Sequence, residues 1–473
     1  MARILSIFAR SYRLRVPKLL QRSRRTAILG GCAREQIRNT GSAEGKVKLF
    51  YGIAGAALLV GVGLVQAQNA GLSHDDQTVI LQDAKIYTSP TAPPIEHGSI
   101  TIRGGKIVSV QAERASADPG VPRLIIINCA RRVVTAGFQN SHVHFTETKW
   151  DEAEHQPAAK LTQQMRDMLT RYGVTTAVDL SSYLANTVAI RTRVDSGEVP
   201  GPRILTAGAG LYPPNGLPFY VRESLPLEIQ RILPQPSTPE EAVKIVREEF
   251  AGGSDLVKLF TGSLVERDKV KPMPVDVARA AVDEAHRNNK LVFTHPSNFV
   301  GIQVALDAHV DVLAHTTPIV GPWDDALIAK MLAIHMSLVP TLKLWEFEAA
   351  KENATFEEQR AFAEKGARQL GAFSKAGGQV LFGTDVGYMT EYDPLEEFIL
   401  MKDAGLTPMQ ILTSLTTAPA ARFKESEKRG TIAPGMEADL VVLNADPAED
   451  VTNFANVRFT IRSGRIIFQP GKR

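Results

Sequence analysis

The chain has 473 residues, of which 44% are hydrophobic and 22% are charged. These values are typical of a globular protein and exclude a disordered chain or a low-complexity fibre. The formal net charge is only +3, but residues 1–48 hold 12 Lys and Arg against 2 Asp and Glu, so this segment carries +10 and the remainder −7. A basic leader before an acidic body gives no indication of nucleic-acid binding.

The leader runs into an uncharged apolar stretch of 17 residues, "LFYGIAGAALLVGVGLV" (49–65), with small residues following at Ala67 and Ala70. This order is typical of a secretory signal peptide, so residues 1–67 are predicted to be a basic leader and signal peptide. An uncleaved N-terminal membrane anchor is the alternative, because the stretch is at the lower limit for spanning a bilayer. The body is expected to be periplasmic or secreted, or anchored to a membrane if cleavage does not occur.

Short β-rich runs separated by turn residues occupy residues 78–135, and comparable runs return at residues 425–470. Their length and Gly-rich spacing predict a small β-sandwich built from both ends of the mature chain. One run, "LIIINCA", contains Cys129, which becomes the single cysteine once the leader is removed. We therefore expect no internal disulfide, and a buried, unreactive thiol.

Between these runs, residues 136–424 alternate apolar strands with amphipathic helical stretches. Eight strand candidates can be counted: "VVTAGF", "VTTAVDL", "RILTAGA", "SDLVKLF", "KLVFTH", "VDVLAH", "MSLVPTL" and "QVLFGTD". Parallel strands need helical crossovers, and a closed barrel has no exposed edges, so an α/β fold with a (β/α)8 barrel is predicted. An open doubly wound sheet is the alternative, but its Gly-rich fingerprint is missing.

A long proline-containing loop follows the third strand candidate and contains Tyr212 and Tyr220. In a barrel such a loop lies at the mouth, where long loops often form lids or specificity walls. The two tyrosines are candidates for substrate contact, with ordinary loop packing as the alternative.

Metal-binding side chains fall where the apolar strand runs end. In "FQNSHVHF", His142 and His144 point to the same side of a strand because side chains alternate between faces. This pair is weak evidence alone, but the ends of other strand candidates add four residues: Lys258, His295, His315 and Asp385. Catalytic groups of a barrel come from these strand ends, so all six side chains are expected to meet. Imidazoles with a carboxylate suit Zn and tolerate other divalent ions.

Lys258 does not suit such a site as an ammonium group, because two divalent ions would repel it. It must be neutral or chemically altered, and carboxylation by carbon dioxide would turn it into an anionic bridging ligand. A lysine lying along the barrel and paired with an acid is the alternative.

The order H-x-H, Lys, His, His, Asp resembles the amidohydrolase superfamily with a binuclear metal centre. "RGTIAPGMEADLVVLNADP" (429–447) is similar to the segment with which those chains return to their β domain, and "DLVKLFTG" and "LFGTDVG" add to the likeness. The resemblance covers about residues 79–468 and is closest to the imidazolonepropionase-like branch with Xaa-Pro dipeptidases and N-acyl amino acid hydrolases. The sequences "THPSN" and "AHTTP" after the fifth and sixth strands depart from that branch, which affects the substrate pocket more than metal ligation.

The resemblance implies hydrolysis of an amide-like C–N bond of a small molecule, with a dipeptide or N-acyl amino acid as the expected substrate. It places one ion, expected to be Zn, on His142, His144 and Asp385, a second on His295 and His315, and carboxylated Lys258 with a hydroxide between them. Asp385 would transfer the proton to the leaving nitrogen. A lactonase or esterase, a deaminase and a non-catalytic periplasmic binding protein are the alternatives, and a homo-oligomer stays open.

Overall fold

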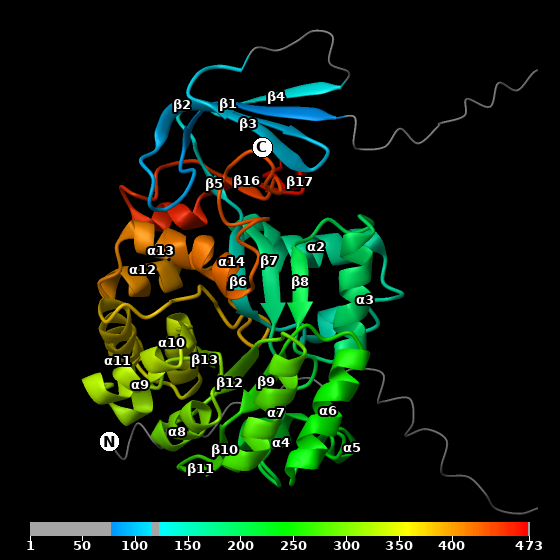
Figure 1. The fold of residues 1–473 in the computed structure, drawn as a ribbon, viewed down its shortest axis with the longest axis vertical. Coiled ribbons are helices and arrows are strands. Elements are labelled where there is room, and N and C mark those ends of the chain that lie inside the picture. Colours follow the sequence, from blue (N-terminus) through cyan, green and yellow to red (C-terminus); the bar gives the residue numbers. More distant parts are fainter. Residues whose placement is uncertain (1–76, 116–122, 472–473) are drawn as a thin grey trace, which may run out of the picture. The chain divides into compact units, whose positions relative to one another are not determined.

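The computed structural model describes residues 77–115 and 123–471. Strands predominate at both ends of this part of the chain, and strands alternate with helices between them (Figure 1). The predicted α/β class is therefore confirmed. The predicted leader, residues 1–67, lies outside the described residues.

One sheet combines strands from both ends of the described chain. Its strands are β1 (Thr78–Ile86), β2 (Ile95–Arg103), β3 (Lys106–Gln111), β4 (Leu124–Asn128), β5 (Val133–Ala136), β15 (Leu440–Leu443), β16 (Val457–Arg462) and β17 (Arg465–Phe468). Their order is β17-β16-β15-β5-β1-β2-β3, with β4 beside β1. The two ends meet where β15 runs antiparallel to β5, with Leu440 opposite Ala136.

This composite sheet has its own apolar core. Leu81, Ile100, Val134 and Leu440 are fully buried and belong to one cluster contributed by both ends of the chain. Cys129 is also buried in this cluster, and burial raises the pKa of its thiol to about 11, as expected of an unreactive cysteine. The ladders form one continuous sheet, and the sandwich arrangement stays a prediction.

Two parallel sheets lie between the ends of the chain. The first consists of β6 (Phe138–Val143), β7 (Val174–Asp179) and β8 (Arg203–Thr206), and the second of β9 (Val257–Phe260), β12 (Val292–His295), β13 (Val312–Ala314) and β14 (Ser337–Val339). A hairpin of β10 (Gly262–Glu266) and β11 (Lys269–Pro272) follows β9 and was not predicted.

The regular ladders do not by themselves close a barrel. Single parallel bridges join the sheets: Leu211 pairs with Leu259 beside β8 and β9, while Val380 pairs with Leu338 and Val386 pairs with Val143. Val380 belongs to the eighth strand candidate and Val386 directly follows it, so this segment contributes isolated pairs rather than a regular strand.

The first strand candidate is also corrected by the structure. "VVTAGF" was expected to open the barrel, but Val133–Ala136 forms β5 of the composite sheet, and the first parallel strand is β6, which begins at Phe138. Gly137 lies at this junction, where an added Cβ would stand 2.2 Å from Thr175 Oγ1. The chain thus passes from one sheet to the next through a close approach that only glycine permits.

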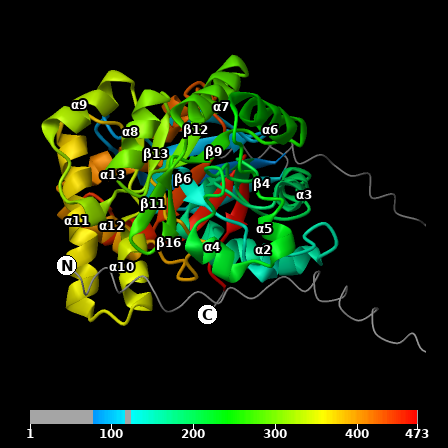
Figure 2. The same ribbon diagram turned by 90° about the horizontal axis from the view of Figure 1, so that it is seen from below.

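Helices connect the parallel strands and surround them in Figure 2. They are α2 (Ala158–Met168), α3 (Leu184–Asp195), α4 (Phe219–Ser224), α5 (Leu227–Gln230), α6 (Pro239–Ala251), α7 (Val275–Arg287), α8 (Phe299–Asp307), α9 (Asp325–Ala333), α10 (Leu342–Lys351), α11 (Phe356–Lys375), α12 (Leu395–Asp403), α13 (Pro408–Leu415) and α14 (Thr417–Arg422). Capping boxes at Thr355 and Thr407 begin α11 and α13 by accepting hydrogen bonds from otherwise unpaired backbone N–H groups.

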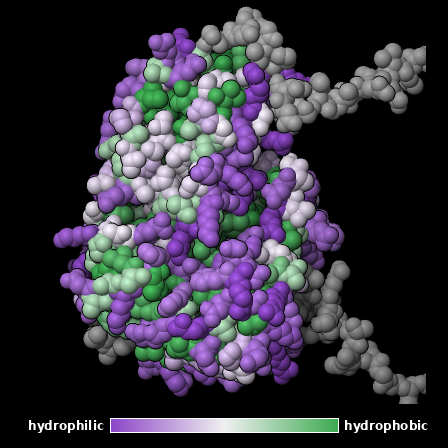
Figure 3. Space-filling model, viewed as in Figure 1, coloured by the Kyte–Doolittle hydropathy of each residue, from purple (hydrophilic) through white to green (hydrophobic). Residues whose placement is uncertain are grey.

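The loop after the third strand is more ordered than its sequence predicted, because it contains α4 and α5. On the face drawn in Figure 3, hydrophilic side chains surround smaller hydrophobic areas. Within residues 77–115 and 123–471, no helix combines the length and apolar character needed to cross a membrane.

Candidate metal centre

The parallel strands bring the six predicted side chains to the same ends of the two sheets. His142 lies in β6 and His144 directly after it, Lys258 lies in β9, and His295 ends β12. His315 follows β13, and Asp385 precedes the bridge between Val386 and Val143. The carboxyl ends of parallel strands share one edge, which explains why residues far apart in the sequence meet here.

His142, His144 and Asp385 are in direct contact. The Nε2 atoms of the two histidines lie 3.2 Å apart, and the Asp385 Oδ1 lies 2.8 Å from Nε2 of His144 and 3.2 Å from Nε2 of His142. One proton cannot satisfy all three contacts at once, whereas an ion between the three atoms would.

His315 and His295 continue the cluster. The His315 ring centroid is 4.7 Å from that of His142 and 4.8 Å from that of His295. One ligand atom each from His142, His315 and Asp385 lies within 4.8 Å of the others. The Nδ1 of His315 is 2.7 Å from Thr341 Oγ1, an arrangement that fixes the ring and leaves Nε2 for a ligand.

Lys258 is fully buried next to this cluster, with 1% of its surface exposed, and its Nζ has no hydrogen-bond partner among the described residues. The predicted alternative, a lysine paired with an acid, therefore finds no support in hydrogen bonding. Burial lowers the pKa of Lys258 to about 7, against the opposing effect of the Asp385 charge. A substantial fraction of this amine is neutral near pH 7.

The histidines are held in the neutral form that metal ions require. Burial lowers the pKa of His142 and of His295 to about 3, and that of His315 well below its usual value. Burial alone would raise the pKa of Asp385, but His142 and His144 outweigh it and hold that pKa well below the usual range. At neutral pH these three imidazoles are therefore neutral and the Asp385 carboxylate is ionised.

Three residues of the cluster have a strained backbone conformation. His315, Thr341 and Asp385 have φ values of 73°, 46° and 63°, a region that residues with side chains seldom occupy. Such strain is typical of functional sites, where the surrounding structure enforces it. At Gly387, φ is 96° and an added Cβ would stand 1.8 Å from the carbonyl oxygen of His144, so only glycine fits this turn.

The residues present fit divalent metal ions. Imidazole nitrogens and a carboxylate converge, they are in the correct protonation states, and at least one imidazole is oriented by a hydroxyl group. Lys258 fits the same site only without its positive charge, which is consistent with its lowered pKa.

Several residues around the cluster were not singled out by the sequence. Thr341 follows β14 by two residues, and the Trp345 ring lies 6.3 Å from that of His315. The predicted candidate Tyr212 stacks on Phe260 with ring centroids 4.3 Å apart, and Tyr220 lies 6.4 Å from Tyr388. The signal for Thr341 was its position near a strand end, the same signal that singled out the candidate ligands.

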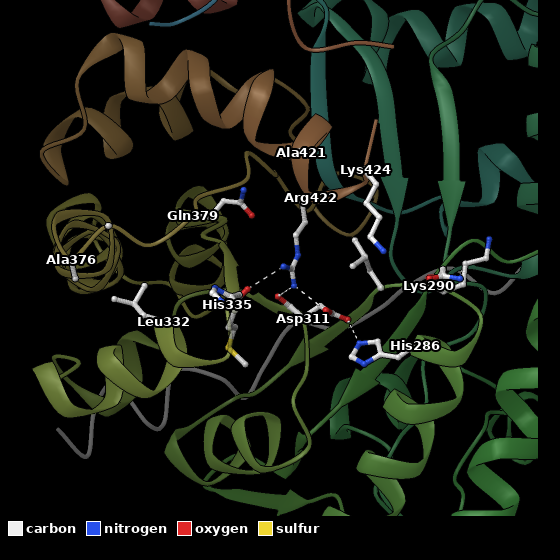
Figure 4. Close-up of a pocket in the computed structure, with 14 residues that line it drawn as sticks. His286, Lys290, Asp311, Leu332, His335, Ala376, Gln379, Ala421, Arg422 and Lys424 are labelled. Carbon is white, nitrogen blue, oxygen red and sulfur yellow. Dashed lines mark hydrogen bonds and ion pairs between the residues drawn. The ribbon is translucent and has the colours of Figure 1, made fainter. Parts of the chain in front are cut away.

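A cavity of about 750 Å³ lies at the opposite ends of the strands (Figure 4). Leu291, Asp311 and Met336, which line it, immediately precede β12, β13 and β14. Arg422 donates to Asp311 at 3.0 Å and to the carbonyl oxygen of His335 at 3.1 Å. Helices α7, α9, α11 and α14 end at this cavity. The basic side chains that line it are therefore explained by the terminal carbonyl groups and the negative dipole ends of those helices.

A profile of the amidohydrolase family matches residues 133–467, which is more than half of the chain. The chain belongs to the amidohydrolase family. The matched residues include all six predicted ligand positions and both parallel sheets.

A curated protein and two solved structures are also similar to this chain. Ochratoxinase of Aspergillus niger is 26% identical over 247 residues, which are 49% of this chain and 50% of that protein, so the match spans about half the length of this curated relative. The structure of A. niger ochratoxinase matches 84% of this chain and 96% of its own with a TM-score of 0.68 and 19% identity. A Xaa-Pro dipeptidase structure with bound methionine matches 83% of this chain and 100% of its own, with a TM-score of 0.71 and 20% identity. These structures show a shared fold.

Proposed function

We propose that this protein is a metal-dependent hydrolase that cleaves an amide-like C–N bond of a dipeptide or an N-acyl amino acid. The observation that carries the proposal is the convergence of imidazoles, a carboxylate and a buried lysine with a lowered pKa at the ends of parallel strands. Family membership supports it, as do a relative named ochratoxinase and a structural neighbour that is a Xaa-Pro dipeptidase.

In this proposal His142, His144 and Asp385 hold one ion, and His295 and His315 hold the other. Two divalent ions bound there, with Zn as the expected metal, would acidify a water molecule and polarise the scissile carbonyl. Asp385 is ionised at neutral pH, as a proton acceptor must be, and would pass the proton on to the leaving nitrogen.

The Lys258 amine would react in its neutral form with carbon dioxide. A new N–C bond would form and one proton would be released, which gives an anionic carbamate whose oxygen atoms would be available as metal ligands. Burial supports this step, because it makes the neutral amine available near pH 7. The oxygen atoms of the carbamate would replace an ammonium group that has no hydrogen-bond partner in the described residues.

We further propose that residues 136–424 form a (β/α)8 barrel, and that residues 78–135 with 425–470 form a β-sandwich. The single bridges at Leu259, Val380 and Val386 support the barrel, since each falls where two ladders would have to join. Periplasmic or secreted localisation is also a proposal, which rests on the sequence of residues 1–67. Fractionation of cells that express the full chain tests it.

A direct test incubates the metal-loaded enzyme with a panel of dipeptides, N-acyl amino acids and lactones. We expect cleavage of amides, with loss of activity in Asp385→Asn. Cleavage confined to lactones would favour an esterase, and release of ammonia from an amino-bearing ring would favour a deaminase. No turnover of any class by protein with two bound ions would refute the hydrolase.

A further inference from the structure

Helix α10 extends from the metal centre into a buried polar cluster that the proposed chemistry does not use. Its first residues are fixed at the site, because Thr341 bonds His315 at 2.7 Å and the buried Glu397 accepts from the backbone N–H of Leu342 at 2.9 Å. Farther along the helix come Glu348 and Lys351, three residues apart and therefore neighbours on its surface.

The turn after Asp385 reaches the same cluster. Backbone hydrogen bonds from Met389 to Asp385 (3.0 Å) and from Gly387 to Met389 (2.9 Å) fold this turn tightly and place Tyr388 in it. The Tyr388 hydroxyl donates to Glu348 Oε1 at 2.8 Å, and Lys351 Nζ lies 2.9 Å from the same oxygen. Helix α10, which carries Lys351, thus begins next to Thr341, and the turn that carries Tyr388 begins at Asp385.

The Lys351–Glu348 pair differs from an ordinary surface pair. Its side chains are 18% and 8% exposed, whereas those of Lys244 and Glu248, also on one helix, are 75% and 65% exposed. Desolvating two charges is costly, so such a pair is weak evidence for a role in stability alone. Its position close to Asp385 indicates a role at the site.

The surroundings of the ammonium group are aromatic. Lys351 Nζ lies 4.1 Å from the ring centroid of Phe347 and 4.5 Å from that of Tyr388, and Tyr220 from the long loop approaches Tyr388. Aromatic side chains around a few fixed polar and charged groups are typical of a small-molecule subsite. The charge of Asp385 acts on Lys351 and on Glu348, which is consistent with a position beside the metal centre.

We propose that Lys351 binds the carboxylate of the substrate, and that Glu348 and Tyr388 hold its ammonium group in position. This rests on the proposed hydrolase function and deepens it, because it names the residue that recognises the free carboxylate that dipeptides and N-acyl amino acids both carry next to the scissile nitrogen. A carboxylate and an ammonium group form a strong, charge-assisted hydrogen bond, and the aromatic rings accommodate an apolar side chain. Lys351 would thereby distinguish amides that carry a free carboxylate from neutral amides.

Binding measurements on the metal-loaded enzyme test this without turnover. Calorimetry compares L-phenylalanine, L-leucine and L-methionine, each with the amine that lacks its carboxylate. We expect the wild type to bind each amino acid about 10- to 100-fold more tightly than its amine, as expected for one hydrogen bond between charged groups. Lys351→Met should abolish this preference, Lys351→Arg should retain part of it, and the exposed Lys244→Met should not change it.

Lys351→Met leaves the buried Glu348 carboxylate without its cation, so thermal unfolding must accompany the measurement. If this variant does not fold, the double variant Glu348→Gln/Lys351→Met removes both charges and keeps an acceptor for Tyr388. Equal binding of acids and amines by the wild type, no binding of any of the amino acids, or a preference that survives in the folded variant overturns the proposal. Hydrolysis of N-acyl amino acids is assayed separately, so that the hydrolase can stand even if Lys351 does not bind the carboxylate.

Discussion

Replacing Lys258 with methionine should stabilise the metal-free protein while it abolishes activity. Methionine has a similar length and fills the same buried space without a charge. Lys258 Nζ is buried without a hydrogen-bond partner among the described residues, and its pKa falls from 10.5 to about 7. At 1.36 kcal/mol per pKa unit, this difference corresponds to about 5 kcal/mol of unfavourable free energy for the buried ammonium.

Relaxation and water penetration reduce such penalties, so we expect a measured gain of about 2–4 kcal/mol at pH 7. Because the folded pKa is lowered, the penalty is fully present below about pH 7 and is relieved as the pH rises toward 10.5. The gain from Lys258→Met should therefore shrink over that interval. Urea unfolding of chelator-treated wild type and variant, at several pH values between 7 and 10, measures it.

Lys244→Met is the matched control, because that side chain is 75% exposed and should change the free energy of unfolding by less than about 0.5 kcal/mol. A metal-free Lys258→Met protein that is less stable than the wild type at pH 7 would refute the reasoning. A gain that is independent of pH would show that the change has a cause other than the buried charge.

Two further substitutions test the groups that hold the ligands. Thr341→Val removes the hydrogen bond to His315 at nearly constant volume and should weaken metal binding about 10- to 100-fold. Thr192→Val, on the exposed side of α3, is the control and should leave metal binding unchanged. Metal titration of both variants measures the difference. Gly387→Ala should displace His144 and lower both metal content and melting temperature, because its Cβ meets the backbone at 1.8 Å. Gly405→Ala has nearly the same φ, 93° against 96°, but open space around it, so it should show only the strain of about 1–2 kcal/mol; equal effects of the two glycine substitutions would contradict the proposed contact.

The convergence of the candidate ligands was predictable because local sequence marks the strand ends on which they lie. His295 and His315 each follow a short apolar run, and burial of such runs as parallel strands forces their carboxyl ends together. The sheet shared by both ends of the chain was also predictable, since only there do β-rich runs follow one another without helical stretches between them.

Other features depend on contacts that the sequence does not display. "QVLFGTD" has the composition of a strand, but it forms an isolated bridge at Val380 instead of a ladder, and the positive φ of Asp385 interrupts extended backbone at its end. "VVTAGF" was assigned to the barrel because no local signal marks Gly137 as the crossing between sheets. The Glu348–Tyr388 hydrogen bond joins residues 40 positions apart, on a helix and a turn that only tertiary packing brings together.

Metal content is the most direct test of the central claim. Elemental analysis of the full chain, purified after expression with Zn supplied and without chelator, should find about two ions per chain. Asp385→Asn and Lys258→Ala should hold clearly fewer, while Lys244→Met should match the wild type. A wild type without bound metal under these conditions would contradict the account, however well the protein is folded.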